Sequence, residues 1–120
     1  MIEILPESQA NLVAVQASES LSTEDYSQIW IPKLINAIDT HGKIRALIVF
    51  DASFQGWQAG AIWEDARFGF QHANDFEKIA LVGASHWIEA VSRLFGHLME
   101  GSVKTFTAEQ RAQAFAWVSA

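Results

Sequence analysis

Hydrophobic and polar positions along this 120-residue chain alternate between a two-residue period and a period near 3.6 residues. The shorter period is typical of β-strands and the longer one of amphipathic helices. Strands are predicted at 2–5, 11–17, 44–50, 79–82 and 102–106. Helices are predicted at about 22–41 and 61–74, with a third after Ser85 and a fourth after the capping-box sequence 107–110. The order ββαβαβαβα predicts an α/β fold, with a mainly parallel five-stranded sheet and helices on both faces.

Local signals define the first predicted helix and the strand that follows it. Ser22 and Asp25 have the spacing of a capping box, and Gly42 stands where a helix commonly ends. Pro32 lies inside this helix and removes a backbone hydrogen bond, so we expect a kink or a restart near Ile31. The run 44–50 is almost continuously apolar, which predicts a central strand covered on both faces.

Length and charge narrow the functional classes. We expect residues 1–120 to form a single domain with a hydrophobic core, since half of them are apolar. A net charge of −6, with scattered basic residues, argues against nucleic-acid binding. The chain contains no cysteine and shows no signal peptide or membrane-spanning run, so we expect a cytoplasmic protein.

The predicted second helix carries a polar cluster formed by Asp65, Arg67 and His72. Asp65 and His72 share a helix face, but seven residues separate them by roughly 10 Å along the axis. That distance is too long for a direct acid–base pair, so a solvated or capping cluster is the commoner explanation. Asp51 follows a central strand, where open α/β sheets place ligands, although holding its own loop through Ser53 is the commoner role for such a residue.

No pattern for catalysis, a metal or a cofactor is present in the sequence. The four histidines lack metal-site spacing, and no glycine-rich phosphate loop precedes a helix. We therefore expect a protein that is not an enzyme, with no catalytic residues, no metal and no cofactor.

Aromatic residues are unusually frequent, with five Trp and eight Phe. Several of them flank or lie on the second predicted helix, and Phe68 and Phe70 cannot both occupy the same helix face. An aromatic core is the commoner explanation. The sharper hypothesis is an apolar pocket or an exposed apolar patch that binds a ligand. Its lining would consist of Trp57, Trp63, Phe68, Phe70 and Trp87.

Several short motifs, taken in order, resemble the SpoIIAA-like family, whose members are relatives of STAS domains. They are Phe54-Gln-Gly-Trp57, Asp65-Ala-Arg-Phe68 with His72, Phe76 to Gly83, Trp87, Phe106 and the alanine-rich end at Trp117. The resemblance implies the β/α fold that STAS domains share with lipid-carrying CRAL-TRIO domains. By that analogy the protein would bind a nonpolar molecule, with a helix able to swing away from the sheet.

The chain departs from the sigma-factor regulators among these relatives. It keeps Asp51 and Ser53, but 58–61 reads Gln-Ala-Gly-Ala where those proteins carry a phosphorylatable serine. The first hypothesis is therefore a carrier or sensor of an apolar, lipid-like ligand, with peripheral membrane contact as a further expectation. The alternative is a STAS-like protein-interaction module without phosphorylation, which includes a homodimer.

Overall fold

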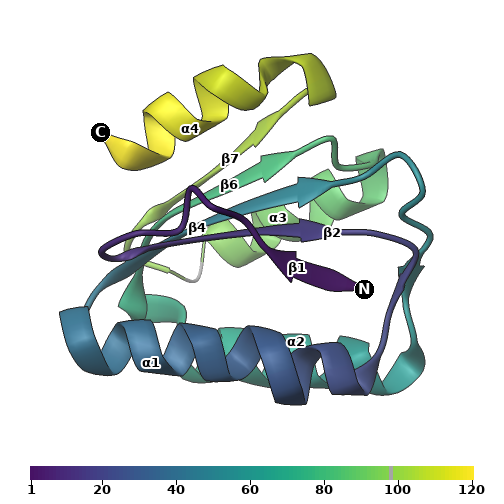
Figure 1. The fold of residues 1–120 in the computed structure, drawn as a ribbon, viewed down its shortest axis with the longest axis horizontal. Coiled ribbons are helices and arrows are strands. Elements are labelled where there is room, and N and C mark those ends of the chain that lie inside the picture. The colour runs from purple at the N-terminus through teal and green to yellow at the C-terminus, as the bar shows by residue number, and fades with distance from the viewer. Residues whose placement is uncertain (98) are drawn as a thin grey trace.

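The computed structural model describes residues 1–97 and 99–120, and for Trp87, Val91, Leu94 and Phe95 the backbone alone. Five strands form one sheet in the order β1-β2-β4-β6-β7 (Figure 1). β1 pairs with β2 in antiparallel fashion, and the remaining pairs are parallel. The strands are β1 (Ile2–Ile4), β2 (Leu12–Ala17), β4 (Ile44–Phe50), β6 (Phe76–Val82) and β7 (Ser102–Phe106). The predicted α/β class and the mainly parallel five-stranded sheet are confirmed.

Helices cover both faces of the sheet, as the strand order predicted. α1 and α2 both lie below the sheet in Figure 1, whereas α4 lies above it. α3 shares the hydrophobic core of α1 and α2, because Ile88 belongs to the same buried cluster as Leu34 and Phe68. The helices are α1 (Ile31–His41), α2 (Ala59–Gln71), α3 (His86–Gly96) and α4 (Arg111–Ser119).

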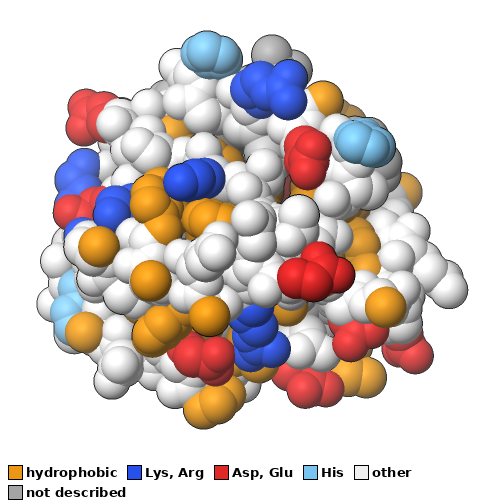
Figure 2. Space-filling model, turned by 90° about the horizontal axis from the view of Figure 1, so that it is seen from above, with side chains coloured by type: hydrophobic (Ala, Val, Ile, Leu, Met, Phe, Trp, Pro, Cys, Tyr) orange, Lys and Arg blue, Asp and Glu red, His pale blue; other side chains and the backbone are white. Residues whose placement is uncertain are grey.

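The pleat of the strands divides the buried residues into two cores. In β2, Val13 and Val15 face the three-helix side, while Leu12 and Ala14 face α4. On the α4 side, Figure 2 shows hydrophobic side chains interspersed with acidic and basic ones. This face therefore presents no extended region of a single charge.

The start of the first helical segment follows the predicted capping signals. The Ser22 backbone N–H donates to the Asp25 carboxylate at 2.8 Å, and the Asp25 N–H donates to the Ser22 hydroxyl at 3.1 Å. A π-helix runs over Asp25–Trp30 before α1 begins at Ile31 with Pro32 in its first turn. The predicted restart near Ile31 is confirmed, since proline fits a first turn without losing a hydrogen bond.

Three local predictions were wrong. The second helix ends at Gln71 rather than near 74, and a 3₁₀ turn (Ala73–Asp75) follows it. β6 begins at Phe76, three residues before the predicted strand start at Ile79. The loop after β4 contains a two-residue strand, β5 (Gly56–Trp57), which pairs with β3 (Ser20–Leu21) in a second small sheet.

In the part of the chain that the structure describes, no helix combines the length and the hydrophobicity needed to cross a bilayer.

Candidate functional site

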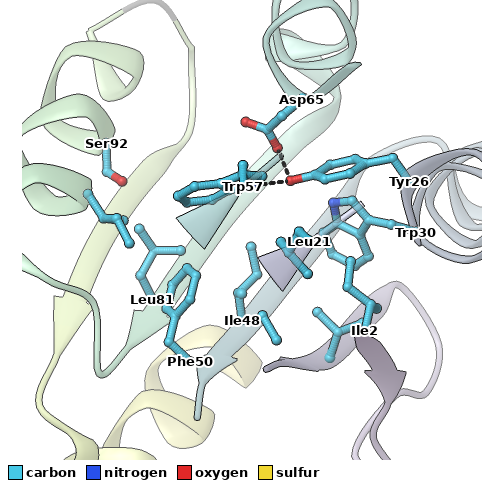
Figure 3. Close-up of a pocket in the computed structure, with 13 residues that line it drawn as sticks. Ile2, Leu21, Tyr26, Trp30, Ile48, Phe50, Trp57, Asp65, Leu81 and Ser92 are labelled. Atoms are coloured by element: carbon cyan, nitrogen blue, oxygen red, sulfur yellow. Dashed lines mark hydrogen bonds between the residues drawn. The ribbon is translucent and has the colours of Figure 1, made fainter. Parts of the chain in front are cut away.

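A pocket of about 130 Å³ lies between the sheet and the three-helix face (Figure 3). Most of its walls are hydrophobic, and they come from β1, β2, β4 and β6 of the main sheet, from β3 and β5 of the small sheet, and from the helices on the same side. The lining residues are Ile2, Val15, Ala17, Leu21, Tyr26, Trp30, Ile48, Phe50, Trp57, Asp65, Leu81, Ile88 and Ser92. The pocket therefore has the mixed apolar and locally polar lining of a small-molecule site.

Ile48 shows that the helices do not cover the sheet completely. It lies in β4, the middle strand of the sheet, where both neighbours in sequence, Leu47 and Val49, are buried. Ile48 itself is only partly buried and lines the pocket. The prediction that this strand is covered on both faces is thus wrong at Ile48, because the helices leave a gap over this side chain.

A chain of two hydrogen bonds runs along one wall of the pocket. The Trp57 indole Nε1–H donates to the Tyr26 hydroxyl oxygen at 2.6 Å, and the Tyr26 hydroxyl donates to Asp65 Oδ1 at 2.9 Å. Figure 3 shows the three side chains converging from different elements. Tyr26 belongs to the π-helix, Trp57 to β5 and Asp65 to α2. These two hydrogen bonds thus connect the small second sheet with two helices.

Burial alters the acid–base properties of both ends of the Tyr26–Asp65 bond. Desolvation raises the pKa of the Asp65 carboxyl, and the hydrogen bond from Tyr26 opposes that rise. Burial, followed by the negative charge of Asp65, raises the pKa of the Tyr26 hydroxyl far above its usual range. Asp65 as a whole is nevertheless exposed to solvent, so its carboxylate lies at the open side of the pocket. Tyr26 consequently acts as a neutral donor at any ordinary pH.

The structure places the predicted aromatic residues in different environments. Trp57 lines the pocket, whereas Trp63 and Phe70 are 76% and 70% exposed on the outer face of α2. Phe68 is buried, but it stacks on His72 with ring centroids 4.4 Å apart and does not line the pocket. The physical reason is the orientation of α2, which buries Ala61 and Phe68, directs Asp65 to the pocket and leaves Trp63 and Phe70 on the outer face. The side chain of Trp87 lies outside the described residues.

The predicted polar cluster separates into independent contacts. His72 Nδ1 lies 2.8 Å from a carboxylate oxygen of Asp75, not near Asp65. Arg67 forms an exposed ion pair with Glu64 at 2.6 Å. The absence of a direct Asp65–His72 pair agrees with the helical spacing, and Asp65 is the member of the cluster that reaches the pocket.

Asp51 borders a different hollow, of about 360 Å³, at the carboxyl ends of β4 and β6. Its carboxylate accepts the Ser53 backbone N–H at 2.8 Å and the Gln16 amide at 3.1 Å. The hydrogen bonds from Ser53 lower the pKa of Asp51. The loop-holding contact between Asp51 and Ser53 is therefore present.

Tyr26, Trp30 and Phe50 are pocket residues that the sequence did not identify as such. Tyr26 and Trp30 belong to the apolar face of the first predicted helix, and that pattern indicates burial without indicating a cavity. Within residues 1–97 and 99–120, no group of three His, Asp or Glu side chains lies close enough to hold a metal ion.

Comparison with known proteins finds matches that span nearly the whole chain. The model of the SpoIIAA-like family matches residues 12–119. The crystal structure of an uncharacterised protein of the DUF3478 family with a SpoIIAA-like fold, from Shewanella loihica PV-4, is similar with a TM-score of 0.77 and 28% sequence identity. That match covers 98% of this chain and 93% of the other. The comparison with curated proteins finds no match.

Proposed function

This chain belongs to the SpoIIAA-like family, and we propose that it is a cytoplasmic, non-catalytic protein that binds a small, mainly apolar molecule. The observation that carries the proposal is the pocket of about 130 Å³ between the sheet and the helices. Its walls expose Ile48 in the middle of the sheet, where a tightly packed domain would leave no space. A binding pocket accounts for this uncovered position.

The size of the pocket sets the size of the ligand. Apolar cavities of about 150 Å³ hold a molecule such as benzene, so a space near 130 Å³ fits a single ring or a short alkyl chain. A complete fatty acyl chain exceeds that volume. A lipid-like ligand would therefore place only one end of its chain here, or would require the helical layer to move outward.

The lining supports binding rather than catalysis. Its described polar side chains are a hydroxyl on Ser92, a hydrogen-bonded tyrosine, two indoles and one carboxylate. Among them no imidazole accompanies the serine, so the nucleophile–base pair that covalent catalysis requires is not assembled in this pocket. The polar groups instead suit the orientation of a bound molecule.

The experiment that tests the proposal combines native mass spectrometry of the purified protein with calorimetric titration of a single-ring compound, toluene. The Ile48→Phe variant should fill the pocket and abolish binding. Ile35→Phe makes the same chemical change on α1 at a side chain that is 40% exposed, so it should bind like the wild type. Failure of the wild type to bind any apolar probe, together with the absence of a retained molecule, would contradict the proposal.

A second candidate function, a protein-interaction module, is favoured by the outer face of α2. Ile62, Trp63 and Phe70 are 52%, 76% and 70% exposed on this helix, an unusual concentration of apolar surface. If the face joins two copies of the chain, light scattering after size-exclusion chromatography will show a dimer. The Trp63→Ser variant would then be monomeric, while a monomeric wild type would argue against self-association.

A further inference from the structure

We propose that the pocket selects a small organic cation, a protonated amine carrying a ring or a short alkyl group. The inference rests on the proposed binding function and specifies the chemical class of its ligand. Three independent features of the lining lead to it: the sign of its charge, its aromatic composition and the direction of its hydrogen bonds.

The charge of the lining is negative and uncompensated. Asp65 is the charged side chain among the described lining residues. Its hydrogen-bond partner within the described part of the chain is the neutral hydroxyl of Tyr26. The neighbouring cation on the same helix, Arg67, is paired with Glu64 on the exposed side. A cationic ligand would therefore supply the counter-charge that the protein does not, and a carboxylate ligand would meet like charge.

The aromatic residues favour the same ligand. Tyr26, Trp30, Phe50 and Trp57 all line the pocket, and the rings of Phe50 and Trp57 meet edge to face with centroids 6.3 Å apart. Aromatic rings attract cations through the negative potential of their faces, and aromatic enclosures are a recurrent means of binding organic ammonium groups. Leu21, Ile48 and the remaining aliphatic residues provide the surface for the apolar part of the amine.

The hydrogen bonds leave an acceptor available for the ammonium group. Trp57 donates to Tyr26, and Tyr26 donates to Oδ1 of Asp65, so both bonds point toward the carboxylate. Figure 3 shows the second carboxylate oxygen of Asp65 directed away from Tyr26. An ammonium N–H can donate to this oxygen in a charge-assisted bond. Desolvation raises the pKa of Asp65 although the residue is exposed at the pocket, and a cation bound beside it would stabilise its negative charge.

Three probes with the same ring and different charge test the inference by calorimetry at neutral pH: cyclohexylammonium, cyclohexanol and cyclohexanecarboxylate. With the wild type, the ammonium should bind at least about tenfold more tightly than the alcohol. The reason is that a hydrogen bond to a charged group is stronger than a neutral one by enough to produce an affinity ratio of about this size. The carboxylate should bind more weakly than the alcohol. In Asp65→Asn the preference of the ammonium over the alcohol should disappear, because the shape is kept while the charge is lost.

Glu64→Gln is the matched control, because it removes an equal charge from the same helix at a residue that does not line the pocket. It should preserve the ratio of the two affinities. If the alcohol binds the wild type as tightly as the ammonium, or if Asp65→Asn keeps the preference, the inference is overturned while the proposed binding function stands. If none of the three probes binds, both fail. The wild-type series decides the question even if Asp65→Asn does not fold.

Discussion

Replacement of Tyr26 by phenylalanine tests whether the hydrogen-bonded chain in the pocket stabilises the fold. The change keeps the ring and removes the hydroxyl that accepts from Trp57 and donates to Asp65. Tyr26 is 3% exposed, so water cannot simply replace the lost group. The variant therefore loses two hydrogen bonds at the centre of the three-helix side.

The magnitude follows from the nature of the two bonds. A neutral hydrogen bond contributes about 1 kcal/mol to stability, and one to a charged group contributes about 1.5–3 kcal/mol. The lower end applies to the bond with Asp65, because solvent reaches part of that residue. We expect a loss of about 2–3 kcal/mol in the free energy of unfolding, which corresponds to a fall in Tm of about 10 °C for a domain of this size.

Urea denaturation at neutral pH, followed by far-ultraviolet circular dichroism, measures this loss. Ser92→Ala is the matched control, since it removes a pocket hydroxyl that forms no hydrogen bond within the described residues. It should change stability by less than about 0.5 kcal/mol. If the stability of Tyr26→Phe also changes by less than about 0.5 kcal/mol, the hydrogen bonds among Trp57, Tyr26 and Asp65 do not stabilise the fold.

Three further predictions concern stability. Because the folded-state pKa of Asp65 lies above its usual 3.8, the folded protein binds this proton more tightly, and stability falls as pH rises through the folded-state value. Asp65→Asn should therefore raise Tm at neutral pH and remove this part of the pH dependence in thermal scans, and an unchanged pH profile would contradict the assignment. Leu34→Ala should cost about 3 kcal/mol in urea denaturation because Leu34 is 1% exposed, whereas Phe70→Ala, at a residue 70% exposed, should cost less than about 0.5 kcal/mol. Gly101→Ala should destabilise by about 2 kcal/mol or more, because its Cβ would overlap the backbone carbonyl oxygen of Glu77, and a Tm equal to the wild type would show that the loop adjusts freely.

The sequence predicted the fold well where hydrophobic periodicity determines it. The run from Ile44 to Phe50 forms the middle strand with the predicted bounds, and Gly42 ends α1 with a positive φ of 82°. The start of β6 was missed because Glu77 and Lys78 interrupt the apolar pattern there. Lys78 is tolerated in the strand because its ammonium group donates to the Trp117 carbonyl oxygen in α4 at 2.9 Å. That contact joins distant segments, so local periodicity gives no indication of it.

The pocket was predictable only in its general character. Aromatic content indicated an apolar site, but the buried residues of α2 are Ala61 and Phe68, while Trp63 and Phe70 are exposed. Asp65 borders the pocket, where Tyr26, 39 residues away in sequence, donates a hydrogen bond to it. Hydropathy places a carboxylate at the surface, and Asp65 is exposed, but hydropathy does not indicate that this carboxylate lies at a pocket. The tyrosine that orients it is supplied by tertiary structure.

A structural role and a binding role for Asp65 predict opposite results for the same variant. If the carboxylate served mainly to hold Tyr26, Asp65→Asn would weaken a charge-assisted bond and lower stability. If the desolvation that raises its pKa dominates, the neutral amide removes a partly desolvated charge while its oxygen still accepts from Tyr26, so stability rises. A gain in stability combined with a loss of preference for the ammonium probe would show that Asp65 weakens the empty protein and strengthens its complex. Groups that oppose folding in this way are characteristic of sites shaped for a ligand.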